Sequence, residues 1–145
     1  MREVSSIFGD QEVRKILEEI APRHANNLMR ATVHGVASTI AKKVKQAAPK
    51  DTGILRKGVK AKRRKSKPGF PISDVIIKSA KGRKSAFYWR FVEYGTSGNN
   101  PQSARPFVSP IVNEEKSKFT ATLKKQFGLK LEKALAREAK KMAKK

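Results

Sequence analysis

The side chains of this sequence that could take part in catalysis or metal binding are a few scattered acids and two histidines. Asp51, Asp74 and Glu93 could meet in space, and converging acids are what a metal-dependent nuclease requires. Nothing in the sequence indicates that they converge. His24 and His34 are ten residues apart, which places them on poorly matched faces of a helix, so we do not expect them to share a metal. Cysteine is absent, which excludes disulfides and thiolate metal sites.

The remaining signals for catalysis are equally weak. Glu18 and Glu19 are adjacent, as are Glu114 and Glu115, and neighbouring side chains on a helix diverge by about 100°, so neither pair forms a carboxylate dyad. No glycine-rich loop is followed by the Gly-Lys-Ser/Thr that cradles nucleotide phosphates. We therefore predict a protein that is not an enzyme and needs no cofactor.

Positive charge dominates the chain. It carries 34 Lys and Arg against 12 Asp and Glu, a net charge of +22, whereas solubility of a small domain needs only about 2–8 charges. Such a surplus predicts an anionic partner: nucleic acid, an acidic protein face or anionic lipid. One compact basic cluster contains no acid and is the candidate DNA-proximal surface: Arg56, Lys57, Lys60, Lys62, Arg63, Arg64, Lys65 and Lys67. A second basic region runs from Lys116 to the C-terminus along a predicted helix.

Three short segments have residue types that make turns and helix caps. They are Ala48–Arg56 (Ala-Pro-Lys-Asp-Thr-Gly-Ile-Leu-Arg), Phe91–Thr96 (Phe-Val-Glu-Tyr-Gly-Thr) and Ala104–Pro110 (Ala-Arg-Pro-Phe-Val-Ser-Pro). In the first, Asp51 and Thr52 can bond backbone amides and Gly53 can take a positive φ. We predict that this turn fixes where a long helix passes into the sheet.

The second and third segments flank a polar loop. Glu93 precedes the loop and Arg105 resumes after it, so we predict an ion pair between them, within a subunit or between neighbours. Phe107, between Pro106 and Pro110, is a rigid apolar residue that either packs under the last helix or contacts another subunit. The candidate loop and subunit contacts are Glu93, Tyr94, Gly95, Thr96, Arg105, Pro106 and Phe107.

Together the three segments resemble the head–tail joining family of long-tailed bacteriophages, its tail-completion, neck and minor tail proteins. Members have a helix ending in a Pro-x-Asp-Thr-Gly-x-Leu turn, a strand ending in Val-Glu-Phe/Tyr-Gly-Thr, and an Ala-x-Pro-Phe-x-x-Pro entry to a final helix. The resemblance covers about residues 10–140. It implies a structural virion protein that completes or caps the tail and joins it to the capsid connector as a ring, with six subunits expected.

The resemblance also implies partners and a location. Connector and tail-tube proteins would lie above and below the ring, genomic DNA would pass near its lumen, and the ring would assemble in the host cytoplasm. No apolar run approaches the roughly 18–20 residues of a membrane span, so no membrane is expected. The basic cluster Arg56–Lys67 and the basic tail depart from the family pattern. They leave open the alternative of a nucleic-acid-binding protein that contacts phosphates through Arg56–Lys67 and the Lys-rich C-terminal helix.

The elements that must position these residues indicate an α+β fold in one domain, residues 1–145: N-terminal helices, a small antiparallel sheet of about three strands and a long C-terminal helix. Residues 1–9 are expected to be flexible and 136–145 to form the basic tail of the last helix. Apolar spacing predicts helices over Asp10–Ile20 and from Pro22 to about Ala48. A last helix is predicted from a Ser109 N-cap, with Pro110 next, through Met142.

The segments predicted to be strands lie between these helices. Ile54–Arg64 could be a strand or partly a helical turn, and Ser73–Ala80 is a short strand. Ala86–Tyr94 alternates aromatic residues and is predicted to be a strand that pairs across a turn at Gly82. Its aromatic side chains could stack nucleobases if exposed, but alternating aromatics more often lie half in the core, which is the interpretation we favour.

Overall fold

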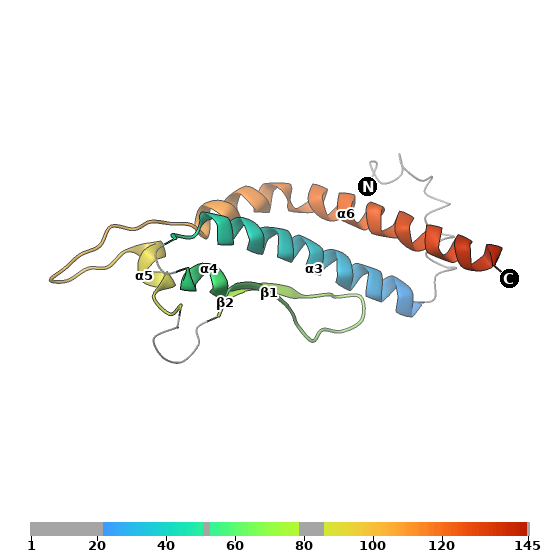
Figure 1. Ribbon diagram of the computed structural model, residues 1–145, viewed down its shortest axis with the longest axis horizontal. Coiled ribbons are helices and arrows are strands. Elements are labelled where there is room, and N and C mark those ends of the chain that lie inside the picture. The colour runs from blue at the N-terminus through green and yellow to red at the C-terminus, as the bar shows by residue number, and fades with distance from the viewer. Residues whose placement is uncertain (1–21, 51–52, 79–85, 145) are drawn as a thin grey trace.

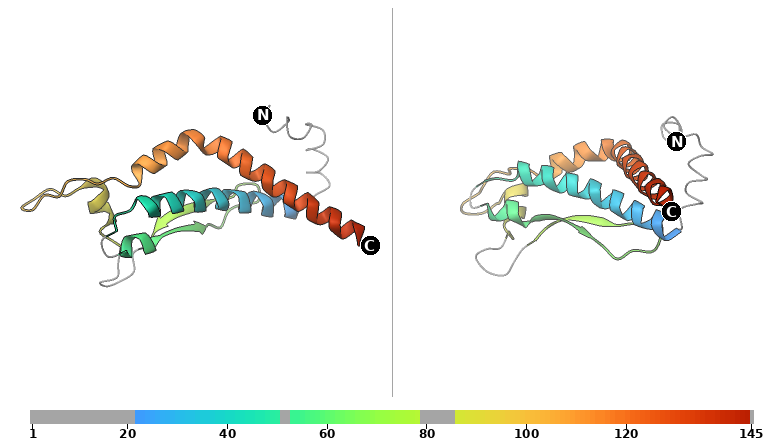
Figure 2. Two further views of the ribbon diagram at one scale, coloured as in Figure 1. Left: turned by 45° about the horizontal axis from the view of Figure 1, so that its top comes forward. Right: turned by 45° about the vertical axis from the view of Figure 1, so that its right-hand side comes forward.

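The computed structural model describes residues 22–50, 53–78 and 86–144. Two long helices, α3 (Pro22–Ala47) and α6 (Ser109–Ala143), lie side by side, and a two-stranded sheet covers the opposite side of α3 (Figure 1). In both views of Figure 2, α3 lies in the middle layer, between α6 and the two-stranded sheet. The described part of the chain is therefore α+β, as predicted, with a long C-terminal helix.

Helix α3 is the element against which the rest of the fold packs. Val36, Ala37, Ala41 and Val44 recur at helical spacing and are buried, so the helix presents one continuous apolar face. Several of these residues are small, which lets neighbouring elements approach closely. The predicted helix from Pro22 to about Ala48 is confirmed; it ends just before Pro49, which cannot continue a helix.

The segment predicted to be a strand or a helical turn is both. Helix α4 (Ile54–Gly58) is one turn long and leads directly into β1 (Val59–Arg63). Strand β1 pairs antiparallel with β2 (Ser73–Ile77), with Val59 opposite Ile77. Because side chains alternate along a strand, Val59 and Ala61 face the core below α3, whereas Lys60 and Lys62 are exposed.

The strand predicted over Ala86–Tyr94 is wrong, because this segment contains a short helix, α5 (Trp89–Tyr94). Helical bonds form from Val92 N to Tyr88 O (3.2 Å) and from Gly95 N to Phe91 O (2.9 Å). A short aromatic run fits either period, and in the helical form Glu93 is buried.

The sheet consequently has two strands among the described residues, where about three were predicted, and the partner of β2 is β1. The loop that joins them is the Pro/Gly segment around Gly69. The predicted turn at Gly82 and the predicted helix Asp10–Ile20 lie outside the described residues.

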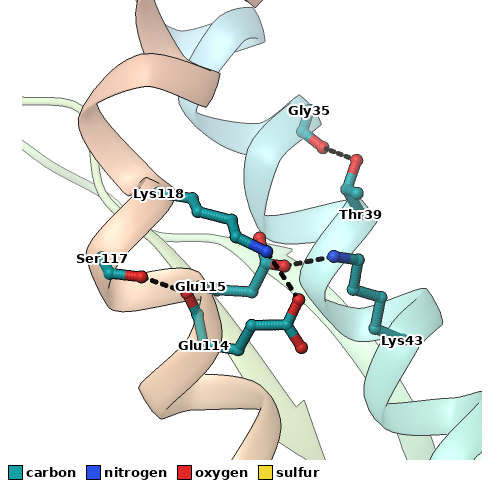
Figure 3. A network of polar contacts seen from close by, with 7 residues as sticks. All are labelled: Gly35, Thr39, Lys43, Glu114, Glu115, Ser117 and Lys118. Atoms are coloured by element: carbon teal, nitrogen blue, oxygen red, sulfur yellow. Dashed lines mark hydrogen bonds and ion pairs between the residues drawn. The ribbon is translucent and has the colours of Figure 1, made fainter.

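Helix α6 runs unbroken over 35 residues, and two polar contacts join it to α3. The Lys43 ammonium pairs with the buried Glu115 carboxylate, next to the exposed pair of Lys118 and Glu114 (Figure 3). Further along, Lys130 Nζ donates to the Ala31 carbonyl oxygen at 2.6 Å. In the part of the chain that the structure describes, no helix is long and apolar enough to cross a membrane.

Candidate functional site

Four hydrogen bonds to one carboxylate join α5 to the start of α6. Glu93 is only 2% exposed, and its carboxylate lies at the N-terminus of α6. Oε2 accepts bonds from the backbone amides of Phe107 (2.8 Å) and Val108 (3.0 Å). Oε1 accepts from the Ser109 amide (2.8 Å) and from the Ser109 hydroxyl. We call these four residues the Glu93 junction.

The junction replaces the cap predicted from sequence. The first intrahelical bond runs from Val112 N to the Val108 carbonyl, so Val108 occupies the N-cap position and Ser109 lies one residue further in than predicted. Val108 has no side-chain acceptor, and Pro110 has no amide to satisfy. A carboxylate from a different helix therefore satisfies the free amides, where the helix dipole also favours negative charge.

The electrostatics of Glu93 follow from competing effects. Burial by itself would raise the pKa of this carboxyl group. The hydrogen bonds from the Ser109 hydroxyl and from the amides of Val108, Phe107 and Ser109 outweigh burial, and the net pKa is lowered from its ordinary value of 4.5. Glu93 is thus held ionised inside the protein as a structural anion.

The ion pair predicted between Glu93 and Arg105 is not formed within the subunit. Four accepted bonds use the hydrogen-bonding capacity of the Glu93 carboxylate, since each oxygen has about two lone pairs. Arg105 takes part through its backbone instead, its amide donating to the Val92 carbonyl oxygen at 2.8 Å, and the residue is exposed. The sequence places both residues correctly beside the loop but does not show that backbone amides outcompete the guanidinium.

An exposed arm projects between the two sides of the junction. All residues from 97 to 106 are exposed, and the segment extends away from the helices (Figure 1). At its base, Thr96 N donates to Gln102 O and Gln102 N donates to Thr96 Oγ1, both at 3.0 Å. Gly95 has φ +74, and a Cβ there would lie 2.6 Å from Gln102 O, so only glycine fits this turn.

The other predicted contact residues divide between core and surface. Phe107 is 3% exposed and belongs to the buried core with Val44 and Leu55, so it packs beneath the last helix. Tyr94 is 71% exposed and shares one face of the α5 region with Phe87 and Phe91, which are also exposed. The Phe87 and Phe91 rings pack edge to face with centroids 6.4 Å apart. We call Phe87, Phe91 and Tyr94 the aromatic face.

The predicted structural turn is described only at Gly53. This residue has φ +69 and precedes α4, as expected of glycine at that position, and its amide donates to Lys50 O at 3.1 Å. Asp51 and Thr52 lie outside the described residues.

The predicted basic cluster also separates into residues with different roles. Arg56 is bound to the end of α3: Nε donates to Ala48 O at 2.9 Å and a terminal nitrogen donates to Gln46 O at 3.1 Å. Arg64 pairs with Asp74 at 2.5 Å. The remaining members are exposed along α4, β1 and the loop after β1: Lys57, Lys60, Lys62, Arg63, Lys65 and Lys67.

One surface was not predicted. An apolar groove of about 260 Å³ lies between α3 and α6, lined by Ala25, Met29, Thr32, Val33, Leu123, Lys124 and Phe127. The apolar spacing of both helices is visible in the sequence. The sequence does not show that the two apolar helix faces leave a groove between them. Among the described residues, no group of three or more His, Asp or Glu side chains could hold a metal ion. Of the three acids considered for a nuclease centre, Asp74 is paired with Arg64, Glu93 caps α6, and Asp51 lies outside the described residues.

A family model described as "Bacteriophage HK97-gp10, putative tail-component" matches residues 11–95, more than half of the chain. The match includes the Ala48–Arg56 segment and all of α5, and it ends at Gly95, before the third motif segment and α6. No curated protein and no solved structure matches the chain.

Proposed function

Because this chain belongs to the HK97-gp10-like family of bacteriophage tail components, we propose that it is a structural protein of the head–tail junction that acts as an oligomeric ring. Membership in the family places the protein in the virion, in contact with other phage tail proteins. The proposed ring completes the tail and joins it to the capsid connector, and it has no catalytic step. Six subunits is the copy number that the motif resemblance implies.

The observation that carries the proposal is the exposed arm on its fixed base. Ten consecutive residues are exposed, yet Gly95, the Thr96–Gln102 bonds and the Glu93 junction hold both ends of the segment in place. The residues at both ends of such a segment are already ordered before it contacts a neighbouring molecule. This lowers the entropy lost on association.

The surfaces next to the arm suit a ring. The aromatic face lies on α5 and the residues just before it, whereas the apolar groove lies between α3 and α6, so these two apolar surfaces of one subunit are different. Contacts between unlike surfaces are heterologous, and they close into a ring when the rotation between subunits allows it. Exposed Phe and Tyr side chains are also the types enriched at the centres of protein interfaces.

The test is the size and shape of the full-length protein. Multi-angle light scattering and negative-stain microscopy should show one closed oligomer, and purified tails should contain the protein at one end. The double variant Phe91→Ser, Tyr94→Ser should shift the oligomer toward monomer. Phe70→Ser, Ile72→Ser, which removes two exposed apolar side chains from the loop between β1 and β2, is the matched control. A monomer at every concentration, together with tails that lack the protein, would exclude the proposal.

A further inference from the structure

A hollow between α3 and β1 gathers positive charge from two elements. Its volume is about 300 Å³, and it is lined by Ser38, Ala41, Lys42, Lys45, Val59, Lys60 and Ala61. Lys42 and Lys45 come from successive turns of α3, and Lys60 comes from β1. No acidic residue lines the hollow.

The lysines of the hollow keep their charge uncompensated within the described part of the chain. The ion pairs there join Lys43 to Glu115, Arg64 to Asp74 and Lys118 to Glu114, and none includes Lys42, Lys45 or Lys60. The remaining buried acid, Glu93, is engaged by the start of α6. Three lysines that line one hollow concentrate positive charge there, which favours binding of an external anion.

The floor of the hollow belongs to the buried core. Ala41 and Val59 are buried members of the core, so the lysines rise from a fixed surface, and Ser38 adds a hydroxyl donor. The negative end of the α3 dipole would oppose an anion here. Arg56 offsets it, because its guanidinium bonds the carbonyls of Gln46 and Ala48.

The charge continues beyond the hollow as a row. Lys60 and Lys62 are both exposed and lie two residues apart on β1, which places their Cα atoms about 6.6 Å apart. Arg63 is exposed at the end of β1, and Lys65 and Lys67 are exposed in the loop that follows. A row of cations matches a chain of phosphates better than it matches one free anion.

We propose that this hollow binds a backbone phosphate of double-stranded DNA, and that the β1 row holds the phosphates that follow. No aromatic side chain lines the hollow, so we expect contacts to phosphates and none to bases. Binding should therefore be independent of DNA sequence. This site is separate from the arm, the aromatic face and the apolar groove, and the proposal does not depend on the ring.

The test measures binding of the full-length protein to a fluorescent 30-base-pair duplex of arbitrary sequence by anisotropy, between 50 and 200 mM NaCl. The variant Lys42→Gln, Lys45→Gln, Lys60→Gln should bind about tenfold or more weakly at 100 mM salt. The slope of log K against log salt should fall in magnitude by about 1–2, since the variant removes the phosphate contact of the hollow and the Lys60 contact of the row, and each phosphate contact contributes about 0.9. Inorganic phosphate should compete only weakly with the duplex, because a free phosphate ion binds in the hollow but does not contact the β1 row.

The matched control is Lys116→Gln, Lys125→Gln, Lys133→Gln, which removes the same charge from exposed positions on α6. It should keep most of the affinity and the slope, and both variants should retain the wild-type circular dichroism spectrum. Equal losses in the two variants would assign binding to net charge alone and overturn the proposal. It would also be overturned if the hollow lysines governed binding to phosphatidylglycerol vesicles while duplex binding was unaffected. Oligomer size, measured on the same variants, reports separately on the ring.

Discussion

At the residue scale, Glu93 shows how one side chain can connect two elements. It belongs to α5, yet the four hydrogen bonds that its carboxylate accepts come from residues 107–109. The sequence singles out this glutamate as a contact residue and gives the wrong partner. The reason is physical: sequence shows which charges are near in the chain, but free amides appear only once the start of a helix is placed in space.

We expect Glu93→Gln to lower the free energy of unfolding by about 2–3 kcal/mol, the scale for hydrogen bonds to a buried charged group. The amide keeps one oxygen acceptor but places an NH₂ group against backbone donors. Urea denaturation followed by circular dichroism would measure the loss. Glu114→Gln, which removes an exposed carboxylate beside Lys118, is the control and should change stability far less. Equal effects of the two substitutions would contradict the role assigned to Glu93.

The lowered pKa of Glu93 also predicts a pH dependence. The folded state favours the ionised form, so its contribution to stability is complete above the ordinary pKa of 4.5 and is lost as pH falls through the lower, folded value. Unfolding free energies measured from pH 7 to pH 3 should therefore fall more steeply below about pH 4.5 in the wild type than in Glu93→Gln. Parallel curves for the two proteins would show that Glu93 does not titrate with folding.

At the scale of elements, the long regular segments could be predicted and the short ones could not. Helix α3 and the last helix have sustained apolar spacing, which only a helix satisfies. The α5 segment has six residues whose aromatic pattern fits a strand equally well, and burial of Glu93 against α6 decides the outcome. Pairing of β1 with β2 was missed for the same reason, because a basic, weakly apolar strand shows little period in sequence.

Glycines inside the two long helices give a prediction at this scale. Gly128→Ala should raise stability by about 0.5–1 kcal/mol, because an added Cβ meets nothing within 4 Å and alanine restricts the unfolded chain. Gly35→Ala is the comparison, since its Cβ would lie 2.7 Å from Gln126 Oε1 on α6. Its gain should be smaller. Thermal unfolding of both variants would measure the difference, and a destabilised Gly128→Ala would show that α6 needs glycine there.

At the scale of the whole molecule, charge is the feature that composition alone establishes. Each ion pair within the subunit joins one cation to one acid and leaves the net charge of +22 unchanged, so like charges repel across the folded surface. Composition could not show where this charge matters. Arg56 and Arg64 belong to the same sequence cluster as Lys60, yet they are bound to the α3 carbonyls and to Asp74, whereas Lys60 lines an open hollow.

We expect the melting temperature to rise by a few degrees between 20 and 300 mM NaCl, because salt screens the repulsion more than it weakens the few ion pairs. Differential scanning calorimetry would measure the change. A neutral osmolyte at the same osmolality is the control, since it alters water activity without screening charge. A melting temperature that falls with salt would mean that attractive pairs outweigh repulsion in the folded protein.

The Glu93 junction has a consequence for how this protein can vary. The start of α6 is fixed by α5 directly, and the chain between them leaves and returns through the Thr96–Gln102 bonds. The intervening arm therefore contributes little to the position of either helix, and lengthening it costs only a slowly growing loop entropy. Its length and composition are free to change while the body stays the same, so one scaffold can be fitted to neighbours of different shape by exchanging a single loop.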